Sequence, residues 1–528
     1  MSGGPAGSFE WPTTDLLTHR AQTTPERTAL VDADTGETWT YRDFDALAWQ
    51  LADAFEATRT RPASDPTGDD TPSRIAVLLE TRVEYAASLF AGERCGLETV
   101  LLHTRETAAE LRAKLERTSP ELLVCGTETE ALALEVAPCP ILSLDAPVSD
   151  EVHGLSSVGG EDRPSGRRNP PEVDLDRSHL VVFTSGTSSE PKGVRLTPRN
   201  LLASASASAL RLGVLPGDRW LSPLPMYHVG GLAPVVRSTL YGTTAVIQRE
   251  FDPVETARAL ARTDCTGVSL VPTMLERLLE TGWEPEPPLR FVLLGGAPAS
   301  VDVLERALEA GVPVHPTFGM TETASQVATA TPAQVAETPG TVGQPLVCTT
   351  VSILAERRDG YAPVGPGERG ELVVSGPTVT PGYLDDEVTD AAFSEWGFHT
   401  GDVGYRDEHG RLWMCGRRTD RIVTGGENVD PDEVAAVLES HPQVRSAAVV
   451  GLADPEWGER VGALLVTGAS EGPSTGHVLE HCRERLAGFK CPKTVGFASE
   501  VPRTHSGTVD REAVRTRLES AGEPVGDE

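Results

Sequence analysis

Residues 181–194, VVFTSGTSSEPKGV, decide how the rest of this chain is interpreted. The apolar run 180–183 is typical of a buried strand, and it opens into six small or hydroxylated residues, 184–189. Small residues let backbone N–H groups approach an anion, hydroxyls add donors, and Lys192 supplies a positive charge. The segment therefore predicts a loop that holds phosphate groups.

The order of residues differs from the Walker phosphate loop, in which the lysine follows the second glycine and a helix begins at once. Here Lys192 precedes Gly193 and a second apolar run, 194–196, follows. A helix is expected only from Thr197, with Pro198 at its first position. The alternative, a surface loop with an incidental lysine, is disfavoured because this order of residues is rare.

Strand and helix patterns alternate on both sides of the loop. Before it, residues 75–79, 99–102 and 122–125 predict strands and residues 83–94 and 107–117 predict helices. After it, similar patterns continue, with strands at 220–224 and 291–294 and, near the end of the chain, a helix at 478–486. This alternation predicts an α/β fold with doubly wound sheets.

The pattern of predicted secondary structure changes twice toward the end of the chain. From Gly340 shorter strands and turns predict a small β-rich subdomain at about 340–416. The last hundred or so residues have their own α+β pattern, so we expect a domain boundary near Thr419. The expected division is a large N-terminal domain, 1–418, and a mobile C-terminal domain, 419–528.

Composition limits the class of partner. The net charge of -32 argues against a nucleic acid or an anionic membrane. Lysine occurs only at positions 114, 192, 490 and 493, and such an acidic, lysine-poor surface suits a high-salt cytoplasm, which leads to the hypothesis of a halophilic source. No apolar run approaches 18 residues and no signal-peptide pattern opens the chain, so a cytoplasmic protein without an integral membrane span is expected.

Two further segments carry polar chemistry. In TFGMTETASQV, residues 317–327, Glu322 can bind magnesium and Thr321 can donate to a phosphate oxygen, although such a segment is also a common helix N-terminus. In HTGD, residues 399–402, Asp402 can accept hydrogen bonds from two ribose hydroxyls, with Arg417 beside the same nucleotide. A plain β-turn remains the alternative for the second segment.

Other candidates are weaker when taken singly. His228, in PLPMYHVGGL, is more often a packed core histidine than a catalytic one. Gly295 and Gly296 with Ala297 follow a predicted strand, where a flat ring could lie against the backbone. Gly425 and Gly426 form a backbone-rich turn that could equally be a simple connection.

Taken together and in this order, these segments resemble the acyl-adenylate-forming superfamily, over nearly the whole chain. Within it, residues 102–105, 294–298 and 319–326 are most similar to the o-succinylbenzoate:CoA ligase branch of menaquinone synthesis. The resemblance implies that a carboxylate attacks the α-phosphate of Mg-ATP to give acyl-AMP, which CoA then converts to a thioester. The implied substrates and metal are ATP, CoA, a carboxylic acid and Mg²⁺, with no tightly bound prosthetic group; a homodimer is left open.

The resemblance also implies residue roles. Thr184, Ser185, Gly186, Thr187, Ser188 and Lys192 would cradle the phosphates, and Thr321, Glu322 and Thr187 would address phosphate and magnesium. Gly295, Gly296, Ala297 and Phe318 would line the adenine pocket, Asp402 and Arg417 would hold the ribose, His228 would lie near the acyl group, and Gly425 and Gly426 near the CoA channel.

One departure from the family pattern bears on catalysis. Thr508 stands where the family places the lysine that stabilises charge during adenylation, and threonine brings no positive charge. We hypothesise that Lys490, Lys493 or an arginine such as Arg503 substitutes for it. The alternatives are a medium-chain fatty or aryl acid:CoA ligase, a loader of a free carrier protein, and a nucleotide-binding protein impaired in adenylation.

Overall fold

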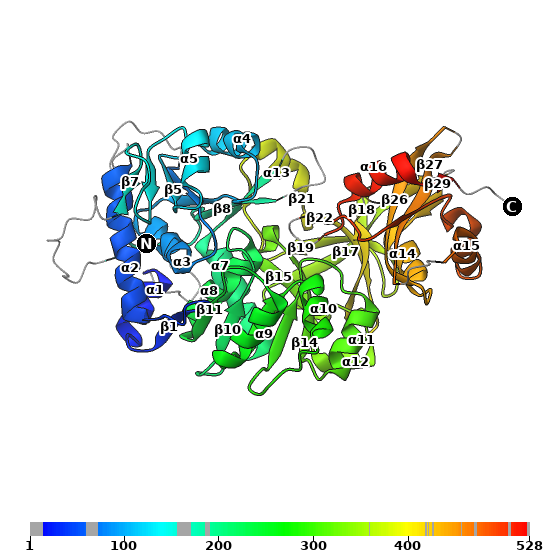
Figure 1. Cartoon of the computed structure of the whole chain (residues 1–528), viewed down its shortest axis with the longest axis horizontal. Helices are drawn as coiled ribbons and strands as arrows, with labels where there is room; N and C mark the ends of the chain where they lie inside the picture. The colour runs from blue at the N-terminus through cyan, green and yellow to red at the C-terminus, as the bar shows by residue number, and fades with distance from the viewer. Residues whose placement is uncertain are drawn as a thin grey trace.

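The computed structural model describes residues 14–59, 72–155, 170–184, 191–357, 360–417, 420, 422–424, 427–455, 457–468, 473–504 and 508–524. Within these residues the strands form four sheets. The two larger sheets come from residues 28–383, and the C-terminal elements, orange to red, lie at one end of the molecule (Figure 1).

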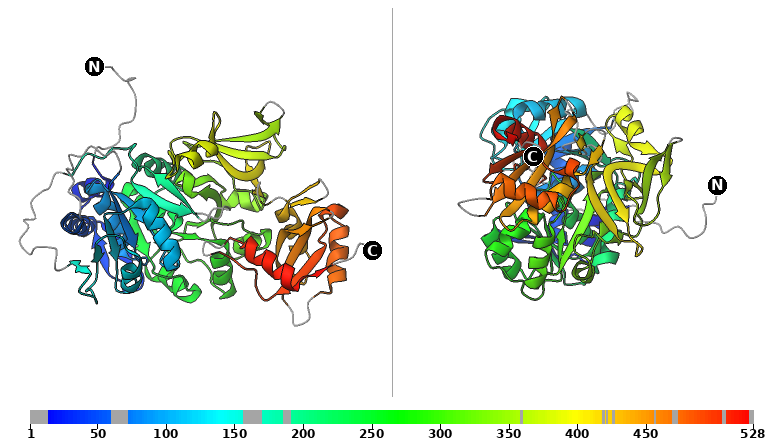
Figure 2. Two further views of the ribbon diagram at one scale, coloured as in Figure 1. Left: turned by 90° about the horizontal axis from the view of Figure 1, so that it is seen from above. Right: turned by 90° about the vertical axis from the view of Figure 1, so that its right-hand side faces the viewer.

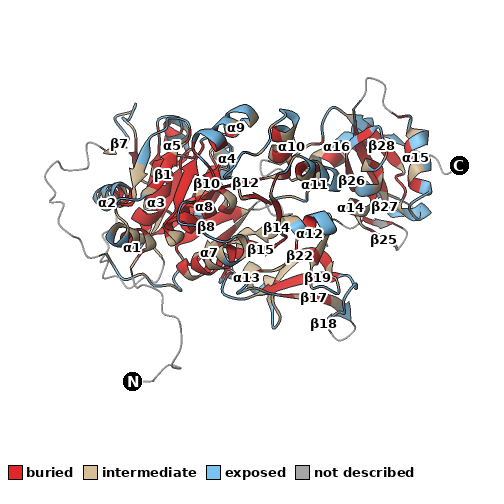
Figure 3. Cartoon of the chain, turned by 90° about the horizontal axis from the view of Figure 1, so that it is seen from below, coloured by how far each residue is buried: buried red, intermediate tan, exposed pale blue. Residues whose placement is uncertain are grey.

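The first large sheet has eight strands and contains the predicted phosphate-loop strands. Its order is β20 (Gly382–Tyr383), β9 (Lys192–Leu196), β8 (Leu180–Thr184), β4 (Glu98–Leu101), β3 (Arg74–Leu78), β5 (Leu122–Cys125), β6 (Ile141–Ser143) and β7 (His153–Gly154). From β8 to β7 neighbouring strands are parallel, whereas β9 and β20 are antiparallel additions. The central strands are apolar runs because both of their faces are buried, as the red ribbons in Figure 3 show.

The second large sheet has nine strands. Its order is β16 (Gln344–Pro345), β15 (Ser325–Thr329), β14 (Val314–Met320), β13 (Phe291–Leu294), β12 (Gly267–Leu270), β10 (Arg219–Ser222), β11 (Thr244–Ile247), β1 (Thr28–Asp32) and β2 (Thr38–Thr40). The predicted strand that begins at Trp220 ends at Ser222, because Pro223 follows.

Helices cover the large sheets. They are α1 (Leu16–Thr23), α2 (Tyr41–Thr58), α3 (Val83–Arg94), α4 (Ala108–Thr118), α5 (Glu130–Val136), α7 (Pro198–Leu212), α8 (Val229–Tyr241), α9 (Pro253–Arg262), α10 (Pro272–Glu280), α11 (Val301–Glu309) and α12 (Pro332–Glu337). The expected start of α7 is confirmed: Pro198 is its first residue, and the Thr197 side chain accepts a hydrogen bond from the Asn200 N–H in a capping box. The predicted α/β class is therefore confirmed.

The third sheet is the β-rich part predicted from Gly340 onward. It contains β18 (Gly360–Pro363), β17 (Thr350–Arg357), β19 (Gly370–Ser375), β22 (Gly397–Arg406) and β21 (Phe393–Ser394), with β23 (Leu412–Arg417) paired to β22 and α13 (Asp386–Ala392) before β21.

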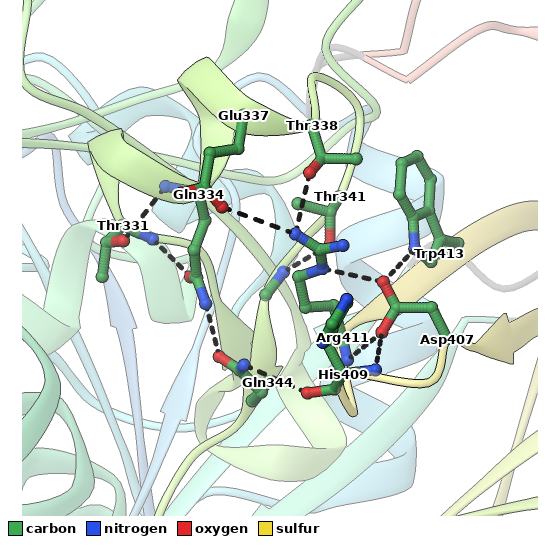
Figure 4. Close-up of polar contacts among 11 residues, drawn as sticks. Thr331, Gln334, Glu337, Thr338, Thr341, Gln344, Asp407, His409, Arg411 and Trp413 are labelled. Carbon is green, nitrogen blue, oxygen red and sulfur yellow. Dashed lines mark hydrogen bonds and ion pairs between the residues drawn. The ribbon is translucent and has the colours of Figure 1, made fainter. Parts of the chain in front are cut away.

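A polar network ties the β22–β23 hairpin to α12 (Figure 4). Arg411 donates from Nε to Asp407 Oδ2 at 2.7 Å and from Nη1 to Thr338 Oγ1 at 2.8 Å. Thr341 Oγ1 donates to the Leu412 carbonyl at 3.0 Å, and Trp413 Nε1 donates to Asp407 Oδ2 at 3.3 Å. The network fixes the hairpin that carries Asp402 and Arg417 against the second large sheet.

The fourth sheet belongs to the C-terminal region. It contains β25 (Glu427–Val429), β24 (Ile422–Thr424), β27 (Gly458–Thr467), β28 (Thr494–Ala498) and β29 (Glu523–Pro524), with β26 (Val444–Asp454) paired to β27, and it packs with α14 (Pro431–Glu439), α15 (Thr475–Arg483) and α16 (Arg511–Ala521). The helix predicted at 478–486 begins earlier, because Ser474 caps it through the His477 N–H.

The C-terminal region contacts the large one through ion pairs, and Figure 2 shows the arrangement of the elements from two further sides. Arg445 of β26 pairs with Glu280 and lies 3.6 Å from Glu276, both on α10. In the described part of the chain, no helix is both long enough and apolar enough to cross a membrane.

Candidate active site

The centre of the site is the side chain of Tyr383, which the sequence analysis did not select. Tyr383 lies in β20, opposite Val194 of β9, and its ring lies 5.3 Å below the Lys192 Nζ. Its hydroxyl donates to Glu322 Oε1 at 3.0 Å. One aromatic side chain thus joins the lysine of the phosphate-loop hairpin to the carboxylate predicted for magnesium. The signal available in the sequence was an aromatic residue after Pro381 and Gly382, a combination too common to single it out.

The protonation state of Tyr383 suits a donor. Burial raises the pKa of the Tyr383 hydroxyl well above its usual range, and the negative charge of Glu322 raises it further. The hydroxyl therefore stays protonated and holds one oxygen of Glu322, while the carboxylate remains able to accept from other ligands. Thr380 supports the same arrangement, because its N–H donates to the Glu322 carbonyl at 2.7 Å.

Glu322 lies in η1 (Thr321–Thr323), a short 3₁₀ helix directly after β14. The alternative of a helix terminus therefore describes the local structure correctly. The carboxylate of Glu322 nonetheless points toward Tyr383 and so into the site. The backbone next to it is unusual. Ala324 and Ser325 have φ values of 51° and 118°, in the left-handed region that side-chain-bearing residues rarely adopt. Strained backbone of this kind gathers at functional sites, where surrounding structure holds it in place.

Asp402 lies opposite, on β22, with Arg417 facing it across the β22–β23 pair. Arg417 Nε lies 3.3 Å from Asp402 Oδ1, and Asp402 is only 8% exposed. Burial raises the pKa of Asp402 to about 6; Arg417 opposes the rise, and the charge of Glu322 adds to it. The influence of Glu322 shows that the two carboxylates share one electrostatic environment.

The second oxygen of Asp402 fits the predicted ribose role. Oδ2 is buried and makes no hydrogen bond with the described residues. A buried acceptor without a partner costs roughly 1–3 kcal/mol, which a ligand hydroxyl would recover. The observation therefore favours a ribose site over a plain β-turn.

The predicted adenine-pocket residues come from adjacent parallel strands. Leu294 of β13 pairs with Pro316 of β14, which places Gly295 and Gly296 beside the segment that contains Phe318. A Cβ added at Gly295 would lie 2.7 Å from Thr317 Cγ2, and Gly296 has a φ of 83°. Both positions thus favour glycine, at Gly295 because Thr317 occupies the space of a side chain and at Gly296 because of the backbone conformation.

Arg237, on α8, is a second site residue that the sequence analysis missed. It is 2% exposed, and it donates from Nη2 to Ser325 Oγ at 3.1 Å and lies 5.2 Å from the Trp220 ring. Burial lowers the pKa of Arg237 to about 10. Among the described residues no carboxylate pairs with it, and Nε has no hydrogen-bond partner.

Arg237 lines a small cavity, the Arg237 cavity, together with Leu201, Ser204, Ala205, Val229, Leu232, Ala233, Val236 and Ala324. Because Ala324 follows η1 directly, the cavity lies beside the Glu322 segment. The sequence contains no cluster of arginines that would identify a dicarboxylate pocket, and the structure places one buried arginine at this cavity. The signal was a single charge in an otherwise apolar helix pattern.

His228 is the N-cap residue, directly before α8. Its ring centroid lies 4.8 Å from that of Tyr227 and 5.8 Å from that of His103. The helix therefore carries His228 at its start and Arg237 farther along, on the side of the site expected for the acyl group.

The remaining predicted residues fall into two groups. Ser185, Gly186, Thr187, Ser188, Gly425 and Gly426 lie outside the described residues; of that loop, Thr184 pairs with Lys192 across β8 and β9. Lys490 pairs with Glu433 at 2.7 Å, and Lys493 Nζ lies 4.6 Å over the Trp457 ring, both contacts within the C-terminal region.

Comparisons with known proteins show similarity over most of the chain. Residues 17–384 match the family model described as AMP-binding enzyme, and residues 433–508 match the AMP-binding enzyme C-terminal domain. The chain is 35% identical to the 2-succinylbenzoate–CoA ligase of Bacillus pumilus over 502 residues, covering 95% of this chain and 97% of that one.

Solved structures of the o-succinylbenzoate coenzyme A synthetase of Bacillus subtilis are similar along the whole chain. Its complex with the acyl-adenylate intermediate superposes with a TM-score of 0.83 at 32% identity, covering 95% of this chain and 98% of that one. Its complex with ATP and magnesium gives a TM-score of 0.82 at 32% identity, covering 96% and 99%.

Proposed function

The chain belongs to the AMP-binding enzyme family, and we therefore propose that it is an ATP-dependent acid–CoA ligase that converts 2-succinylbenzoate to 2-succinylbenzoyl-CoA. In the first step an oxygen of the substrate carboxylate attacks the α-phosphate of ATP, and pyrophosphate leaves. In the second step the sulfur of CoA attacks the acyl carbon, and AMP leaves. The near full-length similarity to ligases of that name supports the choice of acid.

The residues of the site have separable tasks in the first step. Lys192 would neutralise phosphate charge, and Asp402 would accept from the ribose hydroxyls through its unpaired oxygen. Glu322, steadied by Tyr383, would hold Mg²⁺, which when bound spreads the negative charge of the triphosphate. Preorganised charges of this kind lower the barrier because they need no reorganisation when the reaction begins.

Arg237 is the observation that carries the choice of acid. A buried guanidinium without a carboxylate partner is costly, and a ligand that brings a carboxylate removes that cost. The substrate 2-succinylbenzoate has two carboxylates, so one can be activated while the other pairs with Arg237. Simple aryl or fatty acids have no second carboxylate to pair with Arg237, which disfavours them as the physiological acid.

We also propose that the chain divides near Thr419 and that its C-terminal part moves between the two steps. The third sheet ends at Arg417 and the fourth begins at Ile422, so a hinge between them would move the whole C-terminal sheet as a unit. Lys490 and Lys493 belong to that unit and would move with it. The hypothesis that one of them substitutes for the lysine replaced by Thr508 is therefore retained.

The proposal is tested by thioester formation in molar KCl with a panel of acids: 2-succinylbenzoate, benzoate, 4-phenylbutanoate and octanoate. We expect 2-succinylbenzoate to exceed each monoacid in kcat/KM by at least a hundredfold. A monoacid that matches it would overturn the assignment. Carboxylate-dependent exchange of pyrophosphate into ATP would separate an impaired adenylation step from a wrong acid.

We also propose a high-salt cytoplasm as the setting of this protein, and the net charge supports the high-salt part. A surface with a net charge of -32 repels itself in dilute buffer, and salt screens that repulsion. We expect activity and the cooperative unfolding transition to decline when KCl falls from about 2 M to 0.1 M. Full activity and an unchanged unfolding midpoint in dilute buffer would contradict the halophilic assignment.

A further inference from the structure

Strand β22 contains a bulge at residues 400–402, which include the predicted ribose ligand. The neighbouring strand β19 pairs Glu371 with Val403 and Val373 with His399. Between these two pairs β19 contributes one residue and β22 contributes three. Bulges interrupt the regular alternation of a strand and redirect the side chains they contain, and they are frequent beside active sites. The β22 bulge therefore decides where the carboxylate of the ribose ligand points.

The buried carboxylate of Glu371 holds the β22 bulge from the neighbouring strand. Its Oε1 accepts a hydrogen bond from the Gly401 N–H at 3.1 Å, and its Oε2 lies 3.2 Å from His399 Nδ1. Glu371 is 5% exposed. Because a carboxylate can only accept, the hydrogen between Glu371 and His399 belongs to Nδ1. One side chain thus binds the residue before the bulge and the residue at its centre.

The backbone of the bulge leads directly from Gly401 to Asp402. Gly401 has a φ of 74°, in the left-handed region, and a Cβ added there would meet no atom within 4 Å. Thr400 Oγ1 donates to the Leu372 carbonyl at 2.8 Å and accepts from the Asp402 N–H at 3.0 Å. The N–H groups of Gly401 and Asp402 are therefore both held by side chains, where an uninterrupted strand would use the carbonyls of its neighbours.

We propose that Glu371 is a positioning residue, which fixes the β22 bulge so that Asp402 accepts from both ribose hydroxyls of ATP. The inference rests on the proposed function, in which Asp402 binds the ribose. Without the Glu371 carboxylate the Gly401 N–H loses its acceptor. Because glycine has the widest choice of backbone conformations, the loop then relaxes at Gly401 and turns the residue that follows it. Such a displacement of Asp402 costs more affinity for a ribose with two hydroxyls than for one with a single hydroxyl.

The preference for a complete ribose therefore measures the orientation of Asp402. A hydrogen bond to a charged group changes an equilibrium constant by about 10- to 100-fold, so the wild type should bind ATP at least tenfold more tightly than 2′-deoxy-ATP or 3′-deoxy-ATP. In Glu371→Met, whose side chain is of similar length but has no such acceptor, this preference should fall at least fivefold. A substitution that only loosened the fold would weaken the binding of all three nucleotides alike.

The test is calorimetric titration of the full-length protein with each nucleotide and Mg²⁺ in high salt. Glu371→Gln is the conservative variant, because its amide oxygen can still accept from the Gly401 N–H and its NH₂ group can donate to the other tautomer of His399. Its preference should stay within twofold of wild type. The matched control is Glu130→Met, since Glu130 is also a buried glutamate that accepts backbone N–H groups, those of residues 148 and 149 between β6 and β7. It should likewise change the preference less than twofold.

Asp402→Ala shows whether Glu371 acts through Asp402. A positioning residue has no effect once the residue that it positions has been replaced. The double variant Glu371→Met, Asp402→Ala should therefore have the same nucleotide preference as Asp402→Ala alone.

Three results would overturn the proposal: an unchanged preference in Glu371→Met, an equal fall in Glu130→Met, or a further fall when Glu371→Met is added to Asp402→Ala. If Glu371→Met does not fold, Gly401→Ala decides, because its methyl group has room and only the left-handed backbone is strained. A fall in preference there supports the proposal, and an unchanged preference overturns it.

The proposed acid and the role of Glu371 fail in different ways. Nucleotide binding is measured without an acid, so turnover of an acid other than 2-succinylbenzoate would change only the acid assigned. A wild type that binds all three nucleotides equally would overturn the ribose role of Asp402 and, with it, the positioning role of Glu371.

Discussion

Replacing Arg237 by methionine should make the protein more stable and less active. The buried guanidinium destabilises the folded protein, and it is proposed to bind a carboxylate of the substrate. Burial lowers the pKa of Arg237 from 12.5 to about 10. Such a shift means that the charged guanidinium lowers the free energy of unfolding by about 3 kcal/mol. This loss is present at every pH below about 10, where Arg237 is charged in both the folded and the unfolded protein. Losing the hydrogen bond to Ser325 offsets about 1 kcal/mol of the gain. We expect Arg237→Met to raise the free energy of unfolding by about 1–2 kcal/mol.

The same substitution should impair use of the second carboxylate. Truncating one partner of a buried charge pair costs about 2–5 kcal/mol, so kcat/KM for 2-succinylbenzoate should fall roughly 10²- to 10³-fold while that for benzoate changes little. Denaturant unfolding and thioester formation, both in high salt, measure the two effects. Arg211→Met is the matched control, since Arg211 is a part-buried arginine on α7 that donates to the Gln344 carbonyl. Loss of stability together with an unchanged preference for 2-succinylbenzoate would refute the reasoning.

Four further predictions concern the nucleotide and the adenylation step. Tyr383→Phe keeps the ring under Lys192 but removes the donor to Glu322, so the Mg²⁺ concentration for half-maximal pyrophosphate exchange should rise about five- to tenfold; an unchanged Mg²⁺ dependence would contradict the role of that hydroxyl. Burial raises the pKa of Asp402 to about 6 in the folded protein, so the ionised carboxylate destabilises the folded state above pH 6, whereas the neutral acid below about pH 4 does not. Asp402→Asn should therefore raise the free energy of unfolding by at most about 3 kcal/mol at pH 8 and leave it unchanged at pH 4. Affinity for ATP in the wild type should weaken as the pH falls through 6, and calorimetric titration at pH 5 and 8 checks this. Single-turnover formation of acyl-AMP should slow at least tenfold in Lys490→Ala or Lys493→Ala; wild-type rates in both would exclude the two lysines as substitutes for the family's lysine.

Much of the fold could be predicted because local signals agreed with one another. The helix predicted at 83–94 and the strands predicted at 122–125 and 291–294 have the predicted bounds. Apolar runs of strand length between turn residues have few other solutions, and Thr197 with Pro198 marks a helix start by backbone chemistry alone. Helix and strand ends elsewhere shifted by a few residues, where a cap such as Ser474 or a proline such as Pro223 decided the boundary.

The sequence by itself determined the class of chemistry, because the segments that contain Lys192, Glu322 and Asp402, taken together and in this order, resemble the acyl-adenylate-forming superfamily. Tertiary structure alone decided which other side chains complete the site. Tyr383 matters because β20 pairs with β9 and brings its hydroxyl to Glu322, a residue 61 positions away. Arg237 matters because folding buries it without a carboxylate partner beside Ala324. Both facts depend on burial and on contacts between distant segments, and a pattern along the chain contains neither.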